Sequence, residues 1–229
     1  MNNVNSKIIV AIDGPAGAGK STIARTVAKN LKITYIDTGA MYRALTYLAI
    51  KNYLSFENDM DKILDLAKSS TIELKDKVED YFVFINGEDV TNLIRTPEIT
   101  KYISFIASES AIRKIMVKKQ QEMGESGGVI LEGRDIQTVV FPNADYKIFL
   151  DATPEERAER RVRDLEKKGF SDIKIEKVLK DINIRDDKDK SRSAGPLKMA
   201  EDAYYLDTTS MSIDEVIKKI LNIIRNNEI

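Results

Sequence analysis

The 229-residue chain contains neither cysteine nor histidine. The absence of cysteine excludes disulfides, thiol nucleophiles and zinc sites built on thiolates. The absence of histidine excludes catalysis by a Ser–His or Cys–His pair and imidazole ligands to a metal. Any metal ion must therefore be bound by oxygen atoms, which favours Mg²⁺. Phosphoryl transfer depends mainly on positioning and electrostatics, so this composition leaves that chemistry open.

Net charge and long apolar runs are missing as well. The 36 lysines and arginines balance 37 acidic residues, so no overall positive field favours a nucleic acid polymer as a partner. No apolar run approaches the roughly 20 residues that span a bilayer, and the run at 8–12 is too short for a signal peptide. We therefore expect a cytoplasmic protein without a membrane or nucleic acid partner. Because no oligomerisation pattern is present, we expect a monomer.

Strand-like and helix-like patterns alternate along most of the chain. Apolar runs predict strands at 8–12, 34–36, 129–131, 146–150 and 204–206. Amphipathic patterns predict helices at 21–31, 40–51, 108–123, from 153 to about 169, and at 212–225. This alternation is typical of an α/β fold in which parallel strands are joined by right-handed crossovers.

The segment from about 52 to 101 has a different pattern. A short helix is expected at 59–69, and an Asn86-Gly87 pair lies between the apolar residues of 81–90. Such a pair between apolar residues is the strongest short hairpin signal. The segment is therefore predicted to be an antiparallel insert in the parallel fold.

A P-loop motif follows the first predicted strand. The pattern G-x-x-x-x-G-K-[ST] is matched in full by Gly14-Pro15-Ala16-Gly17-Ala18-Gly19-Lys20-Ser21. Its glycines let backbone N–H groups turn towards phosphate oxygens, and the helix that follows directs its positive dipole end at the same place. Lys20 is expected along the β and γ phosphates of ATP, and Ser21 is expected to bind Mg²⁺. These eight residues and Thr22 form the predicted ATP site.

Three polar clusters follow later in the chain. They are Asp37–Arg43, Glu132–Asp135 and Arg185–Arg192. The first two come directly after predicted strands, and segments that follow parallel strands converge on one crevice. Several arginines directed at one crevice suit a second substrate that carries a phosphate group.

Taken together, the segments D-T-G-A-M-Y-R, G-R-D-I-Q-T-V-V-F-P, K-I-F-L-D-A and R-D-D-K-D-K-S-R resemble the bacterial cytidylate kinases. The resemblance implies an adenylate-kinase-like parallel sheet with helices on both faces, a monophosphate-binding insert and a short lid. It implies one domain over 5–227, with the core at about 5–51, 102–153 and 171–227, the insert at about 52–101 and the lid at about 154–170. The implied activity is the transfer of a phosphoryl group from ATP–Mg²⁺ to CMP or dCMP, in pyrimidine nucleotide metabolism.

The same resemblance implies which residues bind the acceptor. They are Thr38, Arg43, Ser104, Arg113, Gly133, Arg134, Asp135, Arg185, Asp189 and Arg192. Ser104, Arg113 and Asp135 would face the cytosine. Arg43, Arg134 and Arg192 would bind the phosphate, Arg185 and Asp189 the sugar hydroxyls, and Thr38 would add a hydroxyl contact. Cytosine offers an amino donor at N4 where uracil has an oxygen, so a carboxylate at Asp135 would select cytosine.

The helix that begins near Thr153 is rich in arginine. Related kinases supply arginines to ATP from this helix, and Arg157 and Arg161 are four residues apart, so both can face one nucleotide. Arg161 joins Lys20, Arg134 and Arg192 as the predicted catalytic residues. The glutamates between the arginines indicate that Arg160 and Arg163 belong to a solvated face.

Two positions depart from the family pattern. Gln137 stands where the family usually has glycine, which predicts a less close approach of the backbone after Asp135 to the ligand. Thr38 stands where serine is commoner, which keeps the hydroxyl and adds a methyl group.

Two other functions are compatible with the motifs. A P-loop kinase can act on another small acceptor, such as a different nucleoside monophosphate or shikimate. A nucleotide-binding switch without turnover is the other alternative, but a switch has no need of a second phosphate site.

Overall fold

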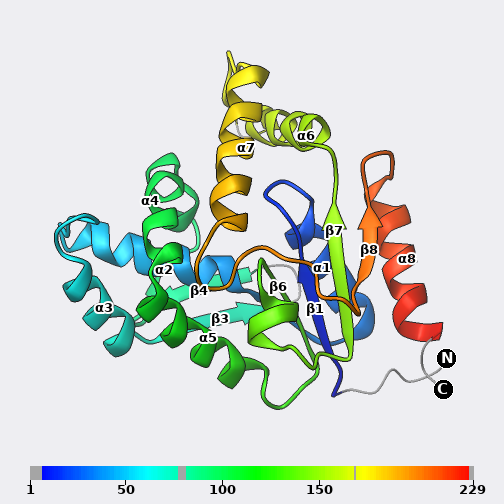
Figure 1. Ribbon diagram of the computed structural model, residues 1–229, viewed down its shortest axis with the longest axis horizontal. Coiled ribbons are helices and arrows are strands. Elements are labelled where there is room, and N and C mark those ends of the chain that lie inside the picture. Colours follow the sequence, from blue (N-terminus) through cyan, green and yellow to red (C-terminus); the bar gives the residue numbers. More distant parts are fainter. Residues whose placement is uncertain (1–6, 77–80, 168, 227–229) are drawn as a thin grey trace.

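The computed structural model describes residues 7–76, 81–167 and 169–226, so both ends of the predicted 5–227 domain lie outside the described residues. Five parallel strands form the central sheet, in the order β2-β6-β1-β7-β8 (Figure 1). They are β1 (Ile9–Asp13), β2 (Thr34–Asp37), β6 (Val129–Gly133), β7 (Tyr146–Asp151) and β8 (Tyr204–Asp207). The predicted α/β fold with a parallel sheet is confirmed.

The strand order places two loops side by side. From the central β1 the chain first moves to β2 on one side and later, after β6, to β7 on the other side. Asp13 at the end of β1 pairs in register with Gly133 at the end of β6. The loops that leave β1 and β6 therefore begin next to each other, at the point of an α/β sheet where ligands usually bind.

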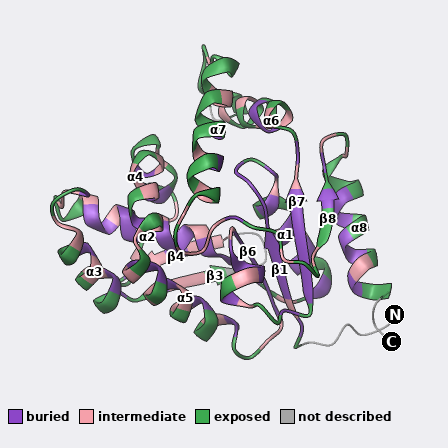
Figure 2. Ribbon diagram, viewed as in Figure 1, coloured by how far each residue is buried: buried purple, intermediate pink, exposed green. Residues whose placement is uncertain are grey.

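Helices cover both faces of this sheet. One face packs against α1 (Lys20–Leu31) and α8 (Ile213–Asn226), through apolar residues such as Ile12, Ile148 and Ile220. The other face packs against α5 (Ser110–Gly124) and the short turn η2 (Ile136–Val140). The strands β1, β2, β6 and β7 are mostly buried, whereas β8 at the edge of the sheet is exposed at three of its four residues, and the outer faces of the helices are exposed (Figure 2). Burial on both faces explains the continuous apolar runs of the four buried strands.

A second unit is built on α2 (Thr38–Lys51). It contains α3 (Met60–Ser69), an antiparallel sheet of β3 (Ile72–Asp76), β4 (Tyr81–Ile85) and β5 (Glu88–Asp89), the turn η1 (Leu93–Arg95) and α4 (Pro97–Ser108). The predicted hairpin is confirmed, and Asn86 and Gly87 both have positive φ, at 52° and 80°. The predicted boundary of the insert at residue 101 falls inside α4.

The chain after β7 rises above the sheet as two packed helices, α6 (Pro154–Lys167) and α7 (Ile175–Lys190) (Figure 1). A segment without regular structure, 191–203, then returns to β8. Sequence patterns predicted α6 but not α7. None of the described helices is long and apolar enough to cross a membrane.

Candidate active site

The P-loop connects β1 to α1, as predicted. Gly14 has a φ of 153°, and a Cβ on it would collide with the backbone carbonyl of Leu150 in β7. Gly17 and Gly19 have φ values of 81° and 82°, in the region that other residues rarely adopt. With Pro15, Ala16 and Ala18, they form a loop that ends at the N-terminus of α1. Backbone N–H groups and the helix dipole favour an anion at this position.

Lys20 folds back over the P-loop. Its ammonium group donates a hydrogen bond to the carbonyl of Pro15 over 2.8 Å, and the residue is 5% exposed. Burial, and then the charge of Arg134, lower the pKa of Lys20 to about 7. An anion bound at the loop would stabilise this ammonium group, because it supplies the charge that burial removes from water.

Ser21 and Glu132 form an oxygen pair beside the P-loop. The Ser21 hydroxyl donates to Oε1 of Glu132, a buried residue of β6, and the Tyr35 hydroxyl donates to the same oxygen over 3.0 Å. Within the described part of the chain, no three acidic side chains gather into a metal site. Mg²⁺ in kinases is held by one or two protein oxygens and by substrate phosphates. The pair fits such an ion, and these two residues would hold it. Thr22, next to Ser21, is exposed in the first turn of α1.

Arginines from separate elements gather near Lys20. Arg134 follows β6, Arg43 lies on α2 and Arg185 on α7. The charges of Arg134 and Arg185 both act on Lys20. Burial and neighbouring arginines lower the pKa of Arg43 to about 10, and burial with the charges of Arg134 and Arg43 lowers that of Arg185 to about 9. The cluster is thus an excess of positive charge beside the P-loop, which suits a second phosphate.

Asp189 on α7 holds two of the predicted phosphate ligands in place. Its carboxylate accepts a hydrogen bond from Nε of Arg134 over 2.8 Å and forms an ion pair with Arg192. Burial alone would raise the pKa of Asp189, but the guanidinium groups of Arg134 and Arg192 hold it below its ordinary value. The carboxylate therefore stays ionised and links α7 to the loop after β6.

Arg113 and Asp135, the predicted cytosine ligands, form a buried ion pair. They are 4% and 6% exposed, and a nitrogen of Arg113 is bonded directly to Oδ2 of Asp135. Arg113 also donates to the carbonyl of Ala107 on α4 over 3.0 Å. Ser104 lies one turn earlier on the same helix. The structure thus brings α4, α5 and the loop after β6 to one place.

Thr38 and Gly133 lie where α2 meets the end of β6. The Thr38 hydroxyl donates to the carbonyl of Glu132 over 2.7 Å. A Cβ on Gly133 would lie 2.7 Å from the Thr38 hydroxyl oxygen and 2.8 Å from the side chain of Ile136. Glycine at 133 therefore lets α2 approach the loop that carries Arg134 and Asp135.

The two predicted ATP arginines of α6 lie in different surroundings. Arg161 is exposed, and its charge reaches Arg43 across the site. Arg157 is 3% exposed and fully engaged: it donates to the carbonyls of Ala152 and Ala16 over 2.9 and 3.0 Å and pairs with Asp186 over 2.6 Å. In this structure Arg157 joins the lid helices to the P-loop, and its contact with ATP stays a prediction.

Comparison with known proteins identifies the family. The family model of cytidylate kinases matches residues 10–226. The chain belongs to the cytidylate kinase family. It is 48% identical over 221 residues to the cytidylate kinases of Bacillus cytotoxicus and Bacillus cereus, and each match covers 96% of this chain and 97% of the relative. The resemblance seen in the sequence motifs is thereby confirmed.

Two solved structures resemble the fold of this cytidylate kinase family member. An uncharacterised protein from Eubacterium ventriosum superposes with a TM-score of 0.53 at 14% identity, over 96% of this chain and 99% of that one. Shikimate kinase from Acinetobacter baumannii, solved with shikimate, gives 0.50 at 16% identity, over 97% and 96%. At such low identity these matches bear on the fold alone.

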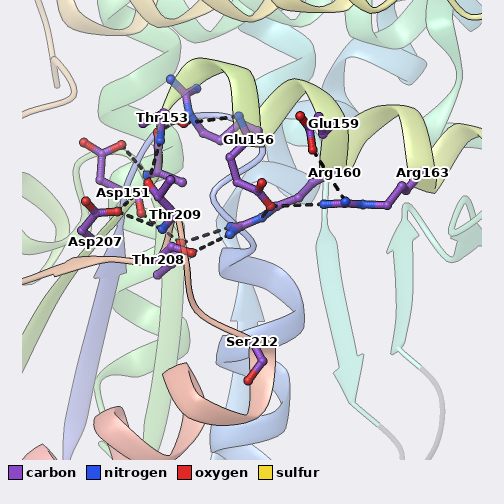
Figure 3. A network of polar contacts seen from close by, with 12 residues as sticks. Asp151, Thr153, Glu156, Glu159, Arg160, Arg163, Asp207, Thr208, Thr209 and Ser212 are labelled. Carbon is purple, nitrogen blue, oxygen red and sulfur yellow. Dashed lines mark hydrogen bonds and ion pairs between the residues drawn. The ribbon is translucent and has the colours of Figure 1, made fainter.

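Arg160 on α6 anchors the predicted lid of this cytidylate kinase family member to the loop after β8 (Figure 3). It donates to the carbonyl and the hydroxyl of Thr208, which follows β8, over 2.6 and 3.1 Å, and to Glu156 over 2.8 Å. The backbone N–H of Thr208 in turn donates to the carbonyl of Asp151 over 2.8 Å. Arg160 was expected on a solvated face, but the loop after β8 provides it with partners.

Three site residues received no role from the sequence. Asp186 accepts the Ala16 N–H over 3.3 Å and pairs with Arg157. Asp13 is fully buried and accepts the N–H groups of Ile136 and Gln137 over 3.0 and 2.8 Å, while burial raises its pKa to about 7. Glu132 had a visible signal, because an acidic residue at the end of a buried strand beside a P-loop is expected near the predicted Mg²⁺ ligand Ser21.

Proposed function

We propose that this chain transfers the γ-phosphoryl group of ATP to CMP or dCMP. The observation that supports the proposal is that Arg134 and Arg185 lie close enough to Lys20 of the P-loop for their charges to lower its pKa. We infer that the P-loop binds the phosphates of ATP and that the arginine cluster around Arg134 binds the phosphate of the acceptor. Membership of the cytidylate kinase family supports a nucleoside monophosphate as the acceptor.

The reaction needs no general base. A phosphate oxygen of CMP forms the new bond to the γ-phosphorus of ATP while the bond from that phosphorus to the β–γ bridging oxygen breaks, giving CDP and ADP. Lys20 and Arg161 would stabilise the charge on the transferring group, and Arg43, Arg134 and Arg192 would orient the acceptor. Mg²⁺, held by Ser21 and Glu132, would neutralise charge on the phosphates.

Recognition of the base would rest on the buried Arg113–Asp135 pair. Its carboxylate accepts a hydrogen bond from the N4 amino group of cytosine, and its guanidinium donates to the ring acceptors. Ser104, on the helix whose Ala107 carbonyl binds Arg113, would add a hydroxyl. UMP would leave Asp135 facing an oxygen, which costs binding because a buried acceptor remains unpaired. A cytoplasmic monomer is the remaining expectation from the sequence.

A coupled assay of ADP release tests the function. CMP and dCMP should be phosphorylated far better than UMP, AMP, GMP or shikimate, and activity should require Mg²⁺. Lys20→Ala and Arg134→Ala should each remove most of the turnover, and thermal denaturation should show that both variants remain folded. Arg163→Ala, which changes an exposed lid arginine, is the control and should retain the parental rate. Preference for a non-nucleotide acceptor would overturn the proposal.

A further inference from the structure

Gln137 lies between the loop after β6 and the segment that returns from the lid. It follows Asp135 by two residues and is 1% exposed. Its backbone N–H donates to the Asp13 carboxylate, and its side-chain carbonyl oxygen accepts the backbone N–H of Ala200 over 3.0 Å. Gln137 therefore connects the end of β1, where the P-loop begins, with a residue 63 positions later in the chain.

Besides this bond, the segment that contains Ala200, 191–203, is attached through the buried side chain of Leu197 and through a few polar contacts. The Leu197 N–H donates to the carbonyl of Asp189 over 2.8 Å, which ties the segment to its own helix α7. Asp202 pairs with Lys147 over 2.6 Å, but its side chain is 68% exposed, so water competes for that pair. The hydrogen bond between Gln137 and Ala200 differs from that pair, because Gln137 is buried. It joins the 191–203 segment to the loop that carries Asp135.

The same segment passes over the predicted cytosine ligands. Gly195 has a φ of 58°, and a Cβ on it would collide with Oδ2 of Asp135 and a guanidinium nitrogen of Arg113. Arg192 stands at its start and is held by Asp189. The path of the segment therefore determines how much room surrounds the Arg113–Asp135 pair.

We propose that Gln137 is a positioning residue for the acceptor, which fixes the 191–203 segment against the Arg113–Asp135 pair through its bond to Ala200. The inference rests on the proposed phosphorylation of CMP. A substitution of the Gln137 side chain removes the bond to Ala200 but keeps the backbone N–H bond to Asp13 at the start of the P-loop, so it should influence the binding of CMP more than that of ATP. The sequence predicted a different effect of Gln137, namely that the backbone after Asp135 approaches the ligand less closely. In the inference made here, the Gln137 side chain acts on another segment, 191–203.

Gln137→Met tests the inference, because methionine has a similar volume but no oxygen to accept the Ala200 N–H. The KM for CMP should rise roughly three- to tenfold, the loss expected of one neutral hydrogen bond. The preference for CMP over UMP, as a ratio of kcat/KM, should fall. The KM for ATP and kcat should change by less than about twofold, since the chemical step keeps its ligands. A purely structural role would instead lower stability and kcat for both substrates without this split.

Gln121→Met is the matched control. The Gln121 side chain donates to the carbonyl of Val140, at the other end of η2, over 2.9 Å. The substitution removes one side-chain bond to the same turn without touching 191–203, so both KM values should stay parental. If Gln137→Met does not fold, Gln137→Ala should give the same split. Hydrogen exchange should show faster exchange of the 191–203 amides in either Gln137 variant.

The outcomes separate the two proposals. A parent chain that does not phosphorylate CMP refutes the proposed function, and this inference with it. A parent chain that phosphorylates CMP, combined with a Gln137 variant whose KM for CMP and CMP:UMP ratio are unchanged, refutes the positioning role alone.

Discussion

Breaking the Arg157–Asp186 pair should strongly destabilise the protein. The two side chains are 4% and 7% exposed, and Asp186→Ala would leave the guanidinium of Arg157 buried without its counter-charge. Removing one partner of a buried pair costs about 3–5 kcal/mol. For a chain of this length, that corresponds to a fall in Tm of roughly 6–20 °C. Calorimetry or circular dichroism would measure it.

The double variant Arg157→Met/Asp186→Leu makes the reasoning testable. It removes the unpaired charge, although the Ala16 N–H and two backbone carbonyls lose their partners. It should therefore be more stable than Asp186→Ala by about 1–3 kcal/mol, despite the additional substitution. Glu159→Ala, which breaks an exposed pair on the same helix, is the control and should change stability by less than about 0.5 kcal/mol.

If the stability losses caused by the two substitutions simply add, the explanation by an unpaired buried charge is refuted. If the double variant is less stable than Asp186→Ala, the destabilisation does not come from an uncompensated charge. Its KM for ATP also distinguishes the two roles of Arg157. Recovered stability with an unchanged KM would assign the residue to the structural link alone, whereas a raised KM would support the predicted contact with ATP.

Two further predictions concern the P-loop lysine and the lid root. Because burial and Arg134 lower the pKa of Lys20 to about 7, and bound phosphates stabilise its ammonium form, ATP binding at pH 8 should take up close to one proton. Below about pH 6 the proton uptake should vanish, since Lys20 is already charged in the free protein. Titration calorimetry in buffers of different ionisation enthalpy measures this uptake. An equal proton uptake by the Lys20→Arg variant would contradict the assignment to Lys20. Arg160→Ala loses the hydrogen bonds to Thr208, so thermal denaturation should show a loss of stability of about 1.5–3 kcal/mol. Replacing the exposed Arg163 by alanine should not lower the stability. If the two variants are equally stable, Arg160 is not an anchor.

Several elements escaped sequence reasoning for identifiable reasons. The first half of α7 has apolar residues at helical spacing, Ile175, Val178, Leu179 and Ile182, so this part of the sequence contained a helix signal that the prediction did not use. The second half is almost entirely charged, only Ile182 and Asp186 of the helix are buried, and α7 packs on α6. The helix α4 was not predicted, and the expected end of the insert at about residue 101 falls inside it. The strand β3 alternates apolar and charged residues from Ile72 to Lys75, which is the period of a half-buried strand, so its sequence contained a signal that the prediction did not use.

The arginines of α6 show where local patterns stop being informative. Arg157, Arg160 and Arg161 lie on one helical turn, and their spacing alone suggests similar roles. Burial separates them, because Asp186 comes from α7 and Thr208 from the loop after β8. Gln137 is a similar case, since its partner Ala200 is distant in sequence.

The sequence by itself determined the parallel sheet, the P-loop and the set of arginines and carboxylates beside it. These features depend on local periodicity, on glycine dihedral angles and on the rule that loops after parallel strands converge, all of which are properties of short segments. Only the tertiary structure decided which charges are paired and which are buried. Those outcomes depend on partners from distant segments and on the removal of water, and no short stretch of residues contains that information.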